Sequence, residues 1–249
     1  MKIFKIQAVV LSVTIATLMG CQSHYALVKS GRGEYHIDST VKVDSGVIKA
    51  YLPYKQKMEK QMSAVLGTSA KNMEPNYDRE SLLGNFYADA AASEAKKLVA
   101  FDFAMPTTKG GLRYAIPQGN ITLSTIFELM PFENELLLIK LKGTDVEELL
   151  NFIAASDGQP VNGIRLKIKD KKPVEVSING QPFDRNKTYL VLTSDYLANG
   201  GDNTKGFANS IERKPIGLRV RDALINYVKQ QTAAGKQINA QLDGRITKN

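Results

Sequence analysis

An aromatic ring and a carboxylate stand six residues apart in the C-terminal half of the chain. Tyr196 and Asp202 are separated by a segment that contains the pair Gly200 and Gly201, and such pairs are typical of tight loops with exposed backbone. The apolar run before them, residues 189–193, predicts a buried strand. We therefore expect a strand end that presents a ring able to stack on a base and a carboxylate able to bind a ribose.

Two further segments carry residues with similar potential. Gly110 and Gly111 precede Arg113; the glycines let the backbone approach a ligand closely, and the arginine can donate two hydrogen bonds to a phosphate or carboxylate. Phe132 and Asn134 lie between a short predicted helix and a predicted strand. Each signal has an ordinary structural alternative, because a GGxR string is more often a simple loop and a loop Phe is normally a core anchor.

Histidine and cysteine are scarce in this chain. The two histidines, His24 and His36, lie near the N-terminus, and the single cysteine is Cys21. A dinuclear phosphoesterase centre needs several His and Asp ligands that converge on one site. No histidine lies in the predicted folded part to activate a serine. We therefore expect neither a metal site nor a catalytic residue for hydrolysis in this chain.

Residues 1–20 have the pattern of a bacterial lipoprotein signal peptide. A basic start is followed by an apolar stretch, residues 6–18, that is too short to span a membrane. Cys21 then follows a lipobox-like sequence, and we expect it to carry the lipid. The alternative is an ordinary buried cysteine, but a thiol at the end of such a stretch has no core to join. Several acyl chains would give stable anchoring, and Gln22 favours the outer membrane, facing the periplasm of the cell envelope.

The charge and length of the chain limit which partners it can bind and how many domains it can form. The net charge is +8, yet the lysines are scattered, and Lys169, Lys171 and Lys172 fall in a predicted hairpin turn. We therefore expect no nucleic acid partner. The length allows a lipidated tether at residues 21–43 and one substantial domain at residues 44–249.

Helix and strand patterns mix without a strict strand–helix–strand repeat, which predicts an α+β domain with a mixed β-sheet and flanking helices. The helix near residue 144 is expected to begin with a capping box of Thr144 and Glu147, and Pro53 could kink or split the first helix. We expect helices at residues 44–66, 80–97, 122–130, from 144 and 216–231, and strands at residues 35–43, 98–104, 135–141, 164–168, 174–178, 189–193 and close to the C-terminus.

Four segments in this order resemble the C-terminal, substrate-binding domain of the 5'-nucleotidase family over residues 44–249. The stretch E-S-L-L-G-N-F-Y-A-D-A, residues 80–90, is similar to the family's E-S-x-L-G-N…D-A helix. G-G-L-R resembles N-x-G-G-[IL]-R, P-F-E-N resembles P-F-x-N, and the loop at residues 195–202 resembles the nucleoside-binding loop. The chain departs from the family at Thr108, where an Asn is usual, at Tyr77, where an Arg is frequent, and at Tyr196, where Phe is usual.

The resemblance implies a role for each matched residue. Arg113 would contact the substrate, Asn134 would reach the base edge, and Asp202 would accept hydrogen bonds from the ribose. Phe132 and Tyr196 would stack on opposite faces of the base. Gly158 occupies the position of a glycine-rich contact loop.

In two-domain members of the family, an N-terminal metallophosphoesterase domain with two metal ions hydrolyses the substrate that the C-terminal domain delivers. This chain resembles the C-terminal domain alone. The resemblance implies that it binds a nucleotide or nucleoside and acts in trans with a separate metallophosphatase, which would hold the divalent metal ions. Two alternatives remain: a nucleoside-binding lipoprotein without a hydrolase partner, and a scaffold that has lost its ligand.

Overall fold

The structure is a computed structural model, and it describes residues 29–248. The chain divides into two compact units, Met1–Lys49 and Ala50–Asn249. The predicted signal peptide and Cys21 lie outside the described residues, so lipid attachment stays a prediction. Across residues 29–248, no helix combines the length and apolar character needed to cross a membrane.

The described part of the first unit contains no strand. The strand predicted at residues 35–43 is wrong, because residues 29–44 form neither helix nor strand. The Asp38 carboxylate instead accepts hydrogen bonds from the backbone N–H and the hydroxyl of Thr40, which closes a local turn. Tyr35 and Ile37 are 94% and 91% exposed, so no burial offsets the lost conformational entropy of an extended strand.

The first predicted helix is confirmed as α2 (Ser45–Met62), and Pro53 lies inside it without ending it. The helix stops earlier than predicted because the next residues form strand β1 (Val65–Ser69), which pairs antiparallel with β3 (Gly119–Thr122). None of the residues of α2 is buried.

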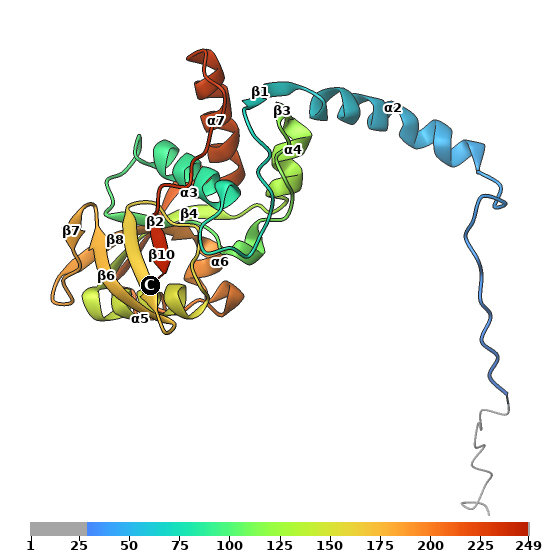
Figure 1. The fold of residues 1–249 in the computed structure, drawn as a ribbon. Helices are drawn as coiled ribbons and strands as arrows, with labels where there is room; N and C mark the ends of the chain where they lie inside the picture. The colour runs from blue at the N-terminus through green and yellow to red at the C-terminus, as the bar shows by residue number, and fades with distance from the viewer. Residues whose placement is uncertain (1–28, 249) are drawn as a thin grey trace, which may run out of the picture. The chain divides into compact units, whose positions relative to one another are not determined.

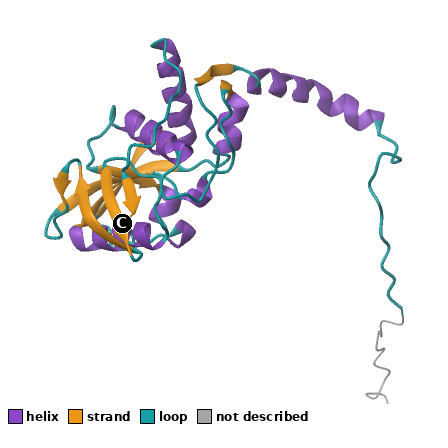
Figure 2. Ribbon diagram, viewed as in Figure 1, coloured by secondary structure: helices purple, strands orange, loops and turns teal. Residues whose placement is uncertain are grey.

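A four-stranded mixed sheet lies at the centre of the second unit (Figures 1 and 2). Its strand order is β2-β8-β4-β9. The edge strand β2 (Phe103–Met105) is parallel to β8 (Thr188–Ser194), whereas β4 (Glu135–Lys142) is antiparallel to both β8 and β9 (Glu212–Arg219). The strand predicted at residues 98–104 is confirmed only at its end, because pairing with β8 begins at Phe103.

Alternation along these strands divides the unit into two hydrophobic cores. Leu136 of β4 and Leu192 of β8 point into one core, together with apolar residues of α3 (Leu82–Ala95), α4 (Leu123–Leu129) and α7 (Val220–Ala233). Ile139 and Val191, on the opposite face, pack with α5 (Gly143–Ala155) and a second sheet. A period of two thus lets each strand contribute to both cores.

The second sheet has the order β10-β5-β6-β7. Strands β5 (Ile164–Lys169) and β6 (Lys172–Ile178) form the predicted lysine-rich hairpin, β7 (Gln181–Pro182) extends it, and β10 (Ile246–Lys248) runs parallel to β5. The predicted α+β class with a mixed sheet and flanking helices is confirmed.

Two helix starts differ from the prediction. The capping box at Thr144 and Glu147 is wrong, because α5 begins at Gly143 without a side-chain cap. The backbone N–H of Gly143 donates to the carbonyl of Lys187 at 2.7 Å, so packing against that loop sets the start. Helix α7 begins at residue 220 rather than 216, since the preceding residues form the edge strand β9.

Candidate functional site

A pocket of about 220 Å³ opens where several strands and loops of the second unit end. Five of the six residues that the sequence suggests for substrate binding line it, although they come from positions up to 89 residues apart along the chain. The lining comprises Tyr87, Pro106, Thr107, Gly110, Gly111, Arg113, Met130, Phe132, Asn134, Ser194, Tyr196 and Asp202.

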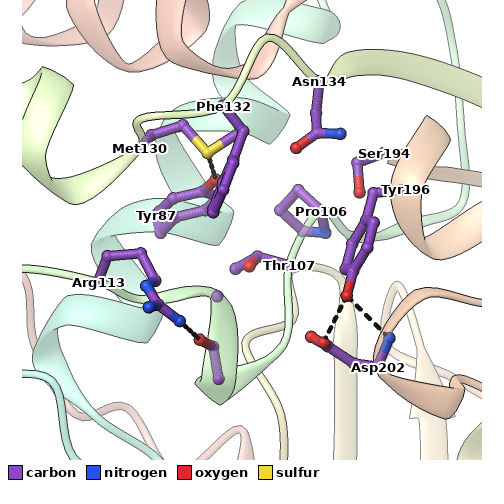
Figure 3. Close-up of a pocket in the computed structure, with 12 residues that line it drawn as sticks. Tyr87, Pro106, Thr107, Arg113, Met130, Phe132, Asn134, Ser194, Tyr196 and Asp202 are labelled. Carbon is purple, nitrogen blue, oxygen red and sulfur yellow. Dashed lines mark hydrogen bonds between the residues drawn. The ribbon is translucent and has the colours of Figure 1, made fainter. Parts of the chain in front are cut away.

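Two aromatic rings stand on opposite sides of the pocket (Figure 3). Phe132 lies between α4 and β4, and Tyr196 lies in the short helix α6 (Asp195–Ala198) that follows β8. Their exposed fractions are 48% and 47%, so both rings keep surface for a ligand. Two half-exposed rings across a cavity are suited to enclosing a flat, apolar-faced molecule by stacking.

The Phe132 loop is held from behind by Arg221 of α7. The Arg221 side chain is buried, donates to the carbonyl oxygens of Met130 and Phe132 at 3.4 and 3.2 Å, and pairs with Glu133. It also lies over the Phe127 ring, 4.1 Å from the ring centroid. The hydrogen bond from Arg221 lowers the pKa of the Glu133 carboxyl. Arg221 therefore positions one of the two rings, although nothing in its local sequence suggests this.

The Tyr196 ring is positioned by the loop that follows it. Its hydroxyl donates to Asp202 Oδ1 at 2.8 Å and accepts from the Asp202 backbone N–H at 3.2 Å. The hydrogen bond to Asp202 is the main cause that raises the pKa of the Tyr196 hydroxyl. A Cβ atom on Gly201 would come within 2.5 Å of the ring. Only glycine therefore lets the loop pack against Tyr196 in this way.

Asn134 and Arg113 line the pocket, and each has polar atoms left over for a ligand. Asn134 donates from Nδ2 to Asp195 Oδ1 at 2.9 Å, which leaves its amide oxygen as an acceptor. Arg113 donates from one nitrogen to the Gly110 carbonyl at 3.4 Å. Within residues 29–248 Arg113 forms no ion pair, so its remaining donors suit an anionic group.

The pocket floor contains residues that the sequence did not reveal. Tyr87 of α3 is fully buried, its hydroxyl lies 3.1 Å from Met130 Sδ, and burial raises the pKa of that hydroxyl. Thr107 and Ser194 add hydroxyls to the lining. Ser194 and Met130 directly precede predicted site segments and could have been suspected. Tyr87 lies in the family-like stretch at residues 80–90, but nothing in that stretch marks its side chain as part of a pocket.

Gly158 is not among the residues that line this pocket. Gly158 has a φ of +94°, and a Cβ atom there would lie 2.1 Å from the Arg79 carbonyl oxygen. The close packing after the end of α5 therefore requires glycine at this position. Its predicted contact with a substrate stays a prediction.

The family frequently has an arginine where this chain has Tyr77, and the nearby Arg79 does not take its place. Tyr77 is 80% exposed, and Arg79 pairs with Asp157 at 3.2 Å. Neither residue lines the pocket. Arg113 is therefore the arginine that the described structure brings to the pocket wall.

The described part of the chain holds no group of three or more His, Cys, Asp or Glu side chains that could bind a metal ion. The side chains of the pocket are apolar, aromatic, hydroxyl and amide groups with one arginine and one carboxylate, and this set does not fit a dinuclear metal centre. Their chemistry fits recognition of an organic ligand.

This geometry agrees with comparisons to known proteins. The protein-family model described as the 5'-nucleotidase C-terminal domain matches residues 63–209 of this chain. A cell wall protein of Listeria monocytogenes, Lmo0130, is 32% identical over 186 residues, covering 68% of this chain and 24% of that protein. An apyrase of Aedes aegypti is 28% identical over 216 residues, covering 78% and 38%. A 5'-nucleotidase precursor from Thermus thermophilus matches with a TM-score of 0.69 and 27% identity, covering 80% of this chain and 42% of that one.

Fold and pocket define an α+β domain whose pocket lies between the half-exposed rings of Phe132 and Tyr196, a two-ring clamp. The family match spans more than half of the chain, and the chain belongs to the 5'-nucleotidase C-terminal domain family. The resemblance predicted from the sequence motifs is thereby confirmed. The chain spans less than half of the length of each of these three relatives.

Proposed function

We propose that this chain binds nucleotides or nucleosides and serves as the substrate-binding part of a 5'-nucleotidase-type hydrolase. The observation that carries the proposal is the pair of half-exposed rings, Phe132 and Tyr196, on opposite sides of a pocket of about 220 Å³. The polar groups around the rings are few and placed on different sides, which suits a ligand with a flat apolar part and polar substituents.

Each pocket group has a task in this function. Phe132 and Tyr196 stack on the two faces of the base, a contact that contributes about 1–3 kcal/mol per base and tolerates every base. The Asn134 amide oxygen accepts from the base edge. The Asp202 carboxylate accepts from ribose hydroxyls, and Arg113 donates to the phosphate.

Hydrolysis is assigned to a separate metallophosphatase, which would hold the divalent metal ions and work in trans with this chain in nucleotide catabolism. Relatives described as a 5'-nucleotidase of Vibrio cholerae and as a cell wall protein support a nucleotide substrate and a location outside the cytoplasm. Lipid attachment at Cys21 would place the chain in the cell envelope, at the outer membrane facing the periplasm.

Calorimetric titration of the full-length protein with adenosine and AMP tests the binding role. We expect saturable binding that weakens about tenfold or more in Phe132→Ala and in Tyr196→Ala, because each loses one stacking contact. Tyr54→Ala is the matched control, since Tyr54 is an exposed tyrosine on α2 that does not line the pocket. Absence of adenosine and AMP binding at millimolar concentration would overturn the proposal.

A phosphate-release assay with AMP separates the trans-acting role from simple binding. The chain is expected to release no phosphate alone and to accelerate release by a metallophosphatase of the same organism. Tight AMP binding without any such acceleration would favour a stand-alone binding lipoprotein.

A further inference from the structure

Both oxygens of the Asp202 carboxylate accept hydrogen bonds from side-chain hydroxyls. The Tyr196 hydroxyl donates to Oδ1 at 2.8 Å, and the Thr108 hydroxyl donates to Oδ2. Asp202 also donates its backbone N–H to the Tyr196 oxygen at 3.2 Å. This hydroxyl network joins the segment after β2 to the segment after β8, two segments 94 residues apart.

Stacking does not require this network, because the aromatic ring alone provides a face for the base. The hydroxyl of Tyr196 is therefore available for a second task beside the pocket. A tyrosine hydroxyl is protonated and can donate at neutral pH, and the hydrogen bond to Asp202 raises its pKa further. Thr108 is 4% exposed, so its hydroxyl is largely shielded from water and is satisfied by Asp202.

The backbone around Asp202 also needs such support. Asp202 and Asn203 have φ values of +53° and +56°, in the left-handed region that costs free energy for residues other than glycine. The bond that the Asp202 backbone donates to Tyr196 and the bonds that its carboxylate accepts from Tyr196 and Thr108 hold this conformation. The carboxylate consequently has one orientation rather than several.

A carboxylate held in this way still has capacity for a ligand. It offers about four acceptor positions, of which the two hydroxyls occupy one on each oxygen. Asp202 lines the pocket beside the Tyr196 ring. An acceptor whose orientation is already fixed loses less entropy on binding than a mobile one.

We infer that the hydroxyls of Thr108 and Tyr196 are positioning groups that make the pocket selective for ligands with free 2'- and 3'-hydroxyls on the sugar. They do so by holding Asp202 as a fixed two-oxygen acceptor next to the stacking ring. This inference rests on the proposed function, and it assigns Tyr196 two separable tasks, stacking by its ring and positioning by its hydroxyl.

The test compares adenosine with 2',3'-dideoxyadenosine in calorimetric titrations of the full-length protein. Wild type is expected to bind adenosine more tightly. Tyr196→Phe and Thr108→Val remove one hydroxyl each with little change in shape, and each is expected to weaken adenosine binding about tenfold while leaving 2',3'-dideoxyadenosine binding unchanged. Thr108→Ser keeps a hydroxyl and is expected to bind adenosine like wild type.

Different outcomes separate this inference from the proposed function. Equal binding of the two ligands by wild type, or an equal loss for both ligands in Tyr196→Phe, would overturn the inference. If Phe132→Ala still weakened binding in those cases, the two-ring clamp itself would stand. If wild type bound neither of these ligands nor AMP, the proposed function would fail and the inference with it. Thermal melting of each variant checks that a loss of affinity does not come from unfolding.

Discussion

Lys109 carries an ammonium group into the protein beneath the Gly110–Gly111 turn. Its Nζ donates to the carbonyl oxygens of Tyr77, Ser156 and Asp157 at 3.0, 2.9 and 3.1 Å. Burial is the main cause that lowers the pKa of this lysine. The Lys109 side chain thus connects the glycine turn of the pocket to the loop at Tyr77 and to the loop at Ser156 and Asp157. A lysine next to two glycines gives no sign of these contacts in the sequence.

Lys109→Met should therefore destabilise the domain. Methionine fills a similar volume but leaves three carbonyl oxygens without their donor, which costs about 1–3 kcal/mol of the free energy of unfolding. Urea denaturation measures the loss. Lys229→Met, on the exposed face of α7, is the control and should change the stability by less than about 0.5 kcal/mol. Equal stability of the two variants would show that these three bonds contribute little.

The segment from Asp195 to Thr204 is the element that connects a central strand to the pocket. Strand β8 is central in its sheet and ends at Ser194, whose side chain caps α6 by accepting from the Leu197 N–H at 3.4 Å. Tyr196 follows within the first turn of α6. The glycine pair then reverses the chain so that Asp202 returns to the ring, with Gly200 at φ +87°.

Gly201→Ala should weaken adenosine binding by displacing the Tyr196 ring, because the added Cβ would lie 2.5 Å from ring carbons. The ring is half-exposed and can move, so we expect the stability to fall by no more than about 1 kcal/mol. Calorimetry and thermal melting measure the two effects.

Gly180→Ala is the matched control for that experiment. Gly180 has φ +76° and open space around the added carbon, so the variant should cost about 1–2 kcal/mol of stability and leave adenosine affinity unchanged. Wild-type affinity in Gly201→Ala would contradict the proposed packing of loop and ring.

At the scale of the whole second unit, Arg245 joins the two cores. It lies just before β10, its side chain is 10% exposed, and it pairs with Asp89 of α3 at 2.7 Å and with Asp243 at 3.0 Å. It also donates to the Val161 carbonyl at 2.8 Å. Burial raises the pKa of Asp243, but the hydrogen bond and charge of Arg245 outweigh it and lower that pKa below the usual 3.8.

Arg245→Met should destabilise the protein by about 2 kcal/mol at pH 7, because Asp89 and Asp243 lose their cation while both remain partly exposed. Asp243 has a lower pKa in the folded state than in the unfolded state. The stability it contributes is therefore present above about pH 4 and is lost as pH falls through the folded-state value.

Urea denaturation of wild type and Arg245→Met at pH 7 and pH 3 measures this dependence, and the difference between the two proteins should narrow at pH 3. Arg185→Met removes an exposed ion pair with Glu147 and should cost less than about 1 kcal/mol at either pH. A difference between wild type and Arg245→Met that is equal at both pH values would exclude the ionic contribution.

The sequence by itself determined the family, the helix that buries Leu83 and Phe86, the lysine-rich hairpin and five of the residues that line the pocket. These features depend on local signals: periodic apolar residues, glycine pairs and short motifs at matching spacing. They can be recognised without knowing which segments meet.

Only the tertiary structure decided the features that depend on distant partners. The edge strands β1 and β9 exist because β3 and β4 are there to pair with them, whereas residues 35–43 lack such a partner within the described residues. Tyr87 of the pocket floor, Arg221 behind Phe132, and Thr108 against Asp202 acquire their roles from contacts across 43 to 94 residues. Burial and hydrogen bonding between distant segments are properties of the folded chain, so no local pattern records them.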